Sequence, residues 1–132
     1  MIVLDTHALL WWASGDKVQL SAAAAHAIDE ELAGGQIMVS SISAWELAML
    51  VDRGRVALSM DIEEWLSVVS RIEAVNFVPV DNEIGVKSVA LPGAFHKDPA
   101  DRIIVATARK LAAPLVTADE EIRRYPHVRT IW

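Results

Sequence analysis

Four acidic residues, far apart in the sequence, stand where they could share one site. They are Asp5, Glu46, Asp101 and Asp119. Carboxylates that crowd together must be protonated or must share a cation, because like charges repel one another. The chain has no cysteine, and oxygen ligands favour a hard cation such as Mg²⁺ or Mn²⁺ over zinc. Such cations commonly serve phosphate chemistry, in which an activated water molecule is the nucleophile.

Each of these acids also has a plainer explanation. Asp5 and Asp119 could simply cap the helices that follow them. Ser43 and Glu46 have the spacing of a capping box, which would tie the glutamate to a backbone N–H. Asp98 precedes a proline, an order typical of a helix cap and the first helical position. Asp101, in the first turn of that helix, could simply favour the positive end of the helix dipole. We therefore interpret Asp98 as a helix cap with at most a supporting role in a site.

Short apolar runs alternate with helical segments along the whole chain. We predict strands at residues 2–4, 37–39, 77–80 and 115–117, with a last short strand within 128–132. We predict helices at about 7–13, 21–33, 43–52, 62–72, 81–90 and 98–112, with a further helical turn after Asp119. This alternation is typical of an α/β fold whose parallel sheet is covered by helices on both faces.

The predicted elements bring the four acids to one edge of that sheet. Asp5 and Asp119 directly follow predicted strands, and Glu46 and Asp101 lie in the first turn of helices at the same end. In open parallel sheets, ligands bind beyond the carboxyl ends of the strands. The joint placement therefore predicts a cation site that no single acid would indicate.

Length and composition set the remaining bounds. The 132 residues predict one domain, 1–132. A hydrophobic fraction of 53% suffices for a core, and a net charge of −6 argues against binding nucleic acid by overall charge alone. The longest apolar runs, about ten residues, are too short to span a membrane. The first residues have no basic segment typical of a signal peptide, so we expect the protein in the cytoplasm.

The combined motifs resemble those of the PIN-domain ribonucleases, in particular the toxins of VapBC-type toxin–antitoxin pairs. The matching segments are residues 2–11, 42–46, 96–102 and 115–119. Each motif alone is weak, but the four together, in the usual order, cover essentially the whole chain. The resemblance implies a three-layer α/β/α sandwich around a central parallel sheet.

The resemblance also implies roles for individual residues. It implies an acidic pocket for one or two Mg²⁺ or Mn²⁺ ions, formed by Asp5, Glu46, Asp101 and Asp119. Asp5 and Asp101 would be the most direct metal ligands, and the other two acids would complete the pocket, directly or through water. Thr6 and Thr117 fall where the family often has a hydroxyl near the site, and could orient a water or an acid.

The implied activity is hydrolysis of an RNA phosphodiester by metal-activated water, which gives a 5′-phosphate and a 3′-hydroxyl. The resemblance further implies a homodimeric toxin that is silenced by a cognate antitoxin protein. A catalytically idle PIN-like interaction module is the alternative, and the presence of all four acids favours the enzyme. A flavodoxin-like phosphoacceptor or phosphatase fits less well, since no glycine-rich phosphate loop follows the first predicted strand.

Several residues around the predicted site also have expected roles. We interpret His7 and His96 as hydrogen-bonded structural histidines, and Trp45 and Trp65 as core residues. One face of the segment 9–12 must pack on the sheet, and its other face is either buried too or a groove for a partner. The basic residues of the last third either rim the acidic edge and hold RNA or form ordinary solvated helix faces. These residues are Lys97, Arg102, Arg109, Lys110, Arg123 and Arg124.

Overall fold

Five parallel strands form the central sheet of the computed structural model, which describes residues 1–132. They are β1 (Ile2–Leu4), β2 (Ile37–Ser40), β3 (Val75–Val78), β4 (Leu115–Val116) and β5 (Thr130–Ile131). Their order across the sheet is β3-β2-β1-β4-β5, and every neighbouring pair is parallel. The first strand therefore lies at the centre, between strands from the two halves of the chain.

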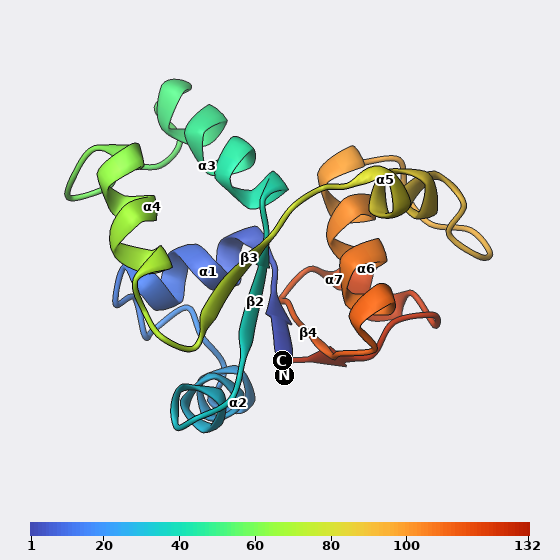
Figure 1. Cartoon of the computed structure of the whole chain (residues 1–132), viewed down its shortest axis with the longest axis horizontal. Coiled ribbons are helices and arrows are strands. Elements are labelled where there is room, and N and C mark those ends of the chain that lie inside the picture. Colours follow the sequence, from blue (N-terminus) through green and yellow to red (C-terminus); the bar gives the residue numbers. More distant parts are fainter.

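Seven helices cover the two faces of this sheet. They are α1 (Thr6–Ala13), α2 (Ala22–Leu32), α3 (Ile42–Asp52), α4 (Ile62–Ser70), α5 (Asn82–Val89), α6 (Pro99–Leu111) and α7 (Glu120–Arg124). Helices α1 to α4 contribute to one hydrophobic core, and α5 to α7 contribute to the other. Figure 1 shows these two groups on opposite sides of the strands. The predicted three-layer α/β/α sandwich is confirmed.

The central strand shows why the sheet needs cover on both faces. Ile2 and Leu4 point into the core beneath α1 to α4, whereas Val3 belongs to the core beneath α5 to α7. Successive side chains of a strand point to opposite faces. An uninterrupted apolar run is therefore buried only when helices lie on both sides of the sheet.

The third strand differs from its predicted position. It was expected over residues 77–80, but it begins at Val75, which pairs with Ile37, and it ends at Val78. Pro79 follows, and a proline has no N–H with which to continue the ladder. The last strand is also shorter than its predicted range, since only Thr130 and Ile131 pair with β4.

The two tryptophans that we assigned to the core behave differently. Trp65 is buried as predicted, but the prediction for Trp45 is wrong, because 58% of that residue is exposed. Helix α3 directs Ser43 and Leu47, one turn apart, toward the interior. A residue midway between them in sequence must project from the opposite side of the helix. No helix in the structure combines the length and the apolar character that crossing a membrane requires.

Candidate active site

The sheet order creates a natural binding position at the carboxyl ends of β1 and β4. In chain order, β2 and then β3 are added on one side of β1, and β4 is added on the other side of β1. Ligands of open parallel sheets bind where the strand order reverses in this way. Asp5 directly follows β1, and its backbone N–H donates to the Val116 carbonyl of β4 at 3.2 Å. The first acid is thus fixed at the reversal point.

One cavity of about 430 Å³ opens at this point and contains all four predicted acids. Besides Asp5, Glu46, Asp101 and Asp119, its lining includes Thr6, His7, Trp11 and Asp98. No lysine or arginine lines it. The structure therefore gathers these four carboxylates, together with that of Asp98, around a cavity that has no lysine or arginine in its lining.

Asp5 caps a helix and faces the cavity at the same time. Its Oδ1 accepts a hydrogen bond from the Ala8 N–H at 2.8 Å, which caps α1, and its Oδ2 accepts one from the Thr117 hydroxyl. The residue is only 7% exposed. Burial raises the pKa of the Asp5 carboxyl above its usual range, although these hydrogen bonds oppose the rise. Asp5 is therefore a helix cap and a lining residue of the cavity at the same time.

Glu46 is held by side chains and forms no capping box. It is the fifth residue of α3, which begins at Ile42, so it lies beyond the first turn where we placed it. Ser43 lies inside the helix, and its hydroxyl is 2.9 Å from that of Thr6. The Thr6 hydroxyl in turn donates to Oε1 of Glu46. The capping-box interpretation is therefore wrong. The Thr6 hydroxyl, which is itself paired with that of Ser43, holds the glutamate at the cavity instead.

Asp98 and Asp101 share the start of α6. Asp98 is its N-cap, as predicted, because its Oδ1 accepts the Asp101 N–H at 3.0 Å and Pro99 is the first helical residue. The Asp101 side chain is 21% exposed. Burial raises its pKa to about 7, with further increases from the negative charges of Asp98, Asp119 and other acids of the cavity.

Asp119 caps α7 while it lines the cavity. Its Oδ1 accepts hydrogen bonds from the N–H groups of Glu121 and Ile122, at 2.9 and 3.0 Å. Its own N–H donates to the Thr117 hydroxyl at 3.0 Å. The same hydroxyl therefore contacts Asp5 and the backbone of Asp119, and it fixes the two acids relative to each other.

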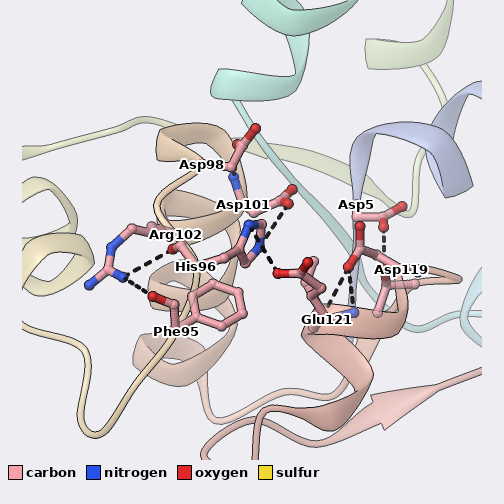
Figure 2. A network of polar contacts seen from close by, with 10 residues as sticks. Asp5, Phe95, His96, Asp98, Asp101, Arg102, Asp119 and Glu121 are labelled. Atoms are coloured by element: carbon pink, nitrogen blue, oxygen red, sulfur yellow. Dashed lines mark hydrogen bonds and ion pairs between the residues drawn. The ribbon is translucent and has the colours of Figure 1, made fainter.

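His96 belongs to the site, which the sequence analysis did not recognise. Its Nε2 lies 3.1 Å from Oδ2 of Asp101, and its Nδ1 lies 3.5 Å from Oε2 of Glu121 (Figure 2). Nε2 is shielded from solvent, and its orientation toward the carboxylate is not that of a hydrogen bond. His96, Asp101 and Asp119 offer ligand atoms within 4.8 Å of one another. The signal was the position of His96 in the same short motif as Asp101.

His7 also departs from our interpretation. It forms no hydrogen bond to hold it as a structural residue; it is exposed at the cavity, with its ring centroid 5.5 Å from that of Trp11. Trp11 in turn packs against Trp132 at 5.9 Å. Leu9 and Leu10 are buried, whereas Trp11 and Trp12 are half-buried. One face of α1 therefore packs on the sheet, while its tryptophans reach the surface.

The basic residues in the last third of the chain fall into two groups. The Arg102 guanidinium donates to four backbone carbonyls, those of Ser88, Val89, Phe95 and His96. Arg109 donates to the His127 carbonyl, and Lys110 pairs with Asp81 and Glu83. These three cations hold the fold and do not rim the acids. Lys97, Arg123 and Arg124 remain exposed.

Comparison with known proteins places this arrangement in a family. The sequence matches the PIN domain over residues 2–128. The chain belongs to the PIN domain family. This PIN domain is 37% identical over 133 residues to Ribonuclease VapC22 of Mycobacterium tuberculosis (strain ATCC 25618 / H37Rv), with 99% of this chain and 98% of that protein covered.

Solved structures share the fold of this PIN domain at low sequence identity. VapBC2 from Rickettsia felis, bound to a DNA fragment from its promoter, superposes with a TM-score of 0.71 at 17% identity, covering 98% of this chain and 97% of that one. A toxin–antitoxin complex from Klebsiella pneumoniae gives a TM-score of 0.64 at 21% identity, covering 97% and 95%. Both likenesses support the three-layer fold.

The cavity of this PIN domain has the donor set that a divalent cation requires. Carboxylate oxygens dominate it, and the shielded Nε2 of His96 lies beside them without a hydrogen-bond partner. Burial raises the pKa values of Asp5 and Asp101, and the negative charges of neighbouring acids add to the rise. A cation bound among these groups would supply the missing charge.

Proposed function

We propose that this PIN domain is a metal-dependent endoribonuclease that acts as the toxin of a toxin–antitoxin pair. The observation that carries the proposal is the cavity at the reversal point of the sheet, where four carboxylates gather without a lysine or arginine. The 37% identity to a protein named a ribonuclease supports RNA as the substrate class. The structural likeness to toxin–antitoxin complexes supports a protein antitoxin as the partner.

The proposed cofactor is Mg²⁺ or Mn²⁺, held chiefly by Asp5 and Asp101. Glu46 and Asp119 complete the pocket, and His96 is an additional candidate ligand because its Nε2 is shielded beside Asp101. When bound, the cation supplies positive charge that offsets the charge of the attacked phosphate and activates water for attack. The products are a 5′-phosphate and a 3′-hydroxyl.

The chain's own residues orient the acids for this reaction. Thr117 and the N–H of Ala8 hold the two oxygens of Asp5, so that the carboxylate cannot rotate. Thr6 holds Glu46, and Asp98 fixes the first turn of α6, from which Asp101 projects. Rigid placement of charged groups is itself a large part of catalysis. No serine or cysteine nucleophile is needed, because water attacks the phosphorus.

Two protein partners belong to the proposal. A cognate antitoxin would silence the toxin by placing a lysine or arginine side chain among the acids, since no lysine or arginine of this chain lines the cavity. The toxin itself would form a homodimer. Trp45, Val86 and Val89 support a protein contact, because they are 58%, 70% and 80% exposed although they are large apolar residues.

The deciding experiment is RNA cleavage by the antitoxin-free protein. Total cellular RNA is incubated with Mg²⁺ or Mn²⁺, and the new 5′ ends are sequenced. EDTA and Asp5→Asn serve as controls, because EDTA removes the metal ion and the substitution removes one of its proposed ligands. Discrete ends that vanish in both controls establish the nuclease and identify its target. Absence of cleavage by folded, metal-loaded protein would favour the alternative, an idle interaction module.

A further inference from the structure

A second, smaller cavity lies beside the acidic one. It has a volume of about 220 Å³, and its lining includes Phe95, His96, Glu121, Arg124 and Tyr125. His96 stands between the two cavities, because one ring nitrogen is 3.1 Å from Asp101 and the other is 3.5 Å from Glu121. Figure 2 shows the imidazole between these two carboxylates, with the Phe95 ring beside it. A ligand could therefore occupy both cavities on either side of one ring.

Aromatic rings form much of this second cavity. The Phe95 and His96 rings meet edge to face at 4.5 Å between centroids, and Phe95 lies 4.6 Å from Tyr125. The tyrosine is buried, and its hydroxyl donates to the Pro92 carbonyl. Arg102 binds the carbonyls of both Phe95 and His96. These contacts hold the rings in place before any ligand arrives, which lowers the entropy cost of binding.

Three exposed basic residues lie in this cavity or next to its lining residues in the sequence. Arg124 lines it, Arg123 precedes Arg124 on α7, and Lys97 follows His96. All three are exposed. The ion pair of Arg124 is with Glu120 at 3.4 Å, and both side chains are more than 70% exposed. An exposed pair of this kind is weak, so the guanidinium can exchange its partner for a phosphate.

We propose that the aromatic cavity binds an unpaired nucleobase of the RNA strand whose phosphate lies at the acidic cavity, with Arg124 on a neighbouring phosphate. This inference rests on the proposed nuclease function and adds to it a position for one base of the substrate. Proteins that bind single-stranded RNA stack its bases on aromatic rings and track its backbone with basic side chains. A base inside a duplex is stacked and paired, so it cannot enter a cavity of this size.

The test measures RNA binding separately from cleavage. The probe is a fluorescein-labelled, random-sequence single-stranded RNA of about 12 nucleotides, alone or annealed to its complement. Fluorescence anisotropy reports its affinity for the Asp5→Asn protein, in which the proposed nuclease is inactive. Phe95→Leu removes the aromatic face but keeps an apolar side chain, and Arg124→Ala removes the exposed cation. The matched controls are Phe77→Leu, the same exchange in β3, and Arg55→Ala, the loss of another exposed arginine.

We expect Phe95→Leu to weaken single-strand binding by about tenfold, as the loss of one base-stacking platform does. Arg124→Ala should weaken it by about fivefold and reduce its salt dependence. Phe95→Tyr should bind like the parent, because the ring is kept. The controls should stay within about twofold of the parent. Only Phe95→Leu should reduce the preference for single-stranded over duplex RNA.

Each other result has a definite meaning. If Phe95→Leu and Arg124→Ala bind like their controls, the nucleobase cavity is wrong, while metal-dependent cleavage by the wild type can still stand. If binding depends on both residues but the wild type does not cleave RNA with metal, the cavity stands and the nuclease proposal fails. If the Asp5→Asn protein does not bind the single-stranded probe, the cavity proposal is overturned.

Discussion

The hydroxyl of Thr117 donates a hydrogen bond to Oδ2 of Asp5, although the two residues lie 112 positions apart in the sequence. The Thr117 hydroxyl oxygen also accepts a hydrogen bond from the N–H of Asp119, at 3.0 Å. Thr117 is completely buried. A single uncharged group therefore sets the spacing of two acids, one from each end of the chain.

Replacing Thr117 by valine should damage the site without changing its shape. The variant leaves a buried oxygen of Asp5 without its partner, which we expect to cost about 1–3 kcal/mol in the free energy of unfolding. RNA cleavage should fall by about 10- to 100-fold, as is typical when a group that orients a metal ligand is lost. Urea denaturation and cleavage assays measure the two effects. Thr117→Ser retains the hydroxyl, so it should keep most of the stability and most of the cleavage activity. Full activity of Thr117→Val would show that the hydroxyl is dispensable.

Asp98 and Asp101 start the same helix, but their amide variants should differ. Asp101→Asn removes a proposed metal ligand, so cleavage should fall by more than about 100-fold. Asp98→Asn keeps a good helix cap, and its activity should stay within about threefold of the wild type. Initial cleavage rates at saturating metal make the comparison. Equal losses in the two variants would place Asp98 among the metal ligands and contradict its role as a cap.

The metal-free protein should lose stability as the pH rises toward neutrality. The pKa of Asp101 is about 7 in the folded state, above its ordinary value of 3.8. Between these values the folded protein holds a proton that the unfolded chain has released, so the free energy of unfolding decreases as pH increases. The raised pKa of Asp5 acts in the same direction.

Asp101→Asn provides the matched control for this pH dependence. The variant cannot ionise at that position, so in EDTA it should unfold at a higher temperature than the wild type at about pH 8, and the difference should shrink toward about pH 5. Thermal denaturation followed by circular dichroism gives both curves. Parallel curves for wild type and variant would mean that Asp101 titrates normally in the folded state.

Divalent metal should stabilise the wild type by binding only the folded state. A metal concentration ten times the dissociation constant adds about 1.4 kcal/mol, which corresponds to about 5 °C in melting temperature for a domain of this size. Asp5→Asn should abolish the shift, whereas Asp98→Asn should retain it. Melting curves with millimolar Mg²⁺ or Mn²⁺ test this directly. A shift that persists in Asp5→Asn would place the bound ion elsewhere.

Arg102 should prove structural even though it adjoins Asp101. Its guanidinium joins the end of α5 to the loop that carries His96. Arg102→Met keeps the aliphatic stem but removes these bonds, and we expect a loss of about 2–4 kcal/mol in unfolding free energy. Arg102→Lys should recover only part of it, since an ammonium group lacks the planar fork. Unchanged stability of the methionine variant would show that the four contacts contribute little.

Much of the fold could be predicted because its signals are local. Apolar runs such as residues 2–4 and 37–39, alternating with capped helical segments, were enough to indicate the parallel sheet and its two helical layers. The helix cap at Asp98 also formed where expected. The position of β3 was missed because its register depends on pairing with β2, which the sequence of β3 alone does not encode.

The composition of the cavity was predictable, but its fine contacts were not. The four acids could be grouped because parallel strands end at one edge of a sheet. The hydrogen-bond partner of Glu46 could not be predicted, because Thr6 comes from a different helix 40 positions away. The role of His96 was missed for a related reason. Its contacts with Asp101 and Glu121 depend on how Arg102 folds the preceding loop, which is a tertiary effect.

The central place of β1 has a consequence for protein synthesis. One edge of β1 pairs with β2 early in the chain, but its other edge must wait for Leu115 and Val116. Thr117 and Asp119, which complete the cavity around Asp5, follow those two residues. The ribosome must therefore synthesise the chain beyond Asp119 before the cavity around Asp5 can close. The proposed nuclease site thus forms only after translation has passed that residue.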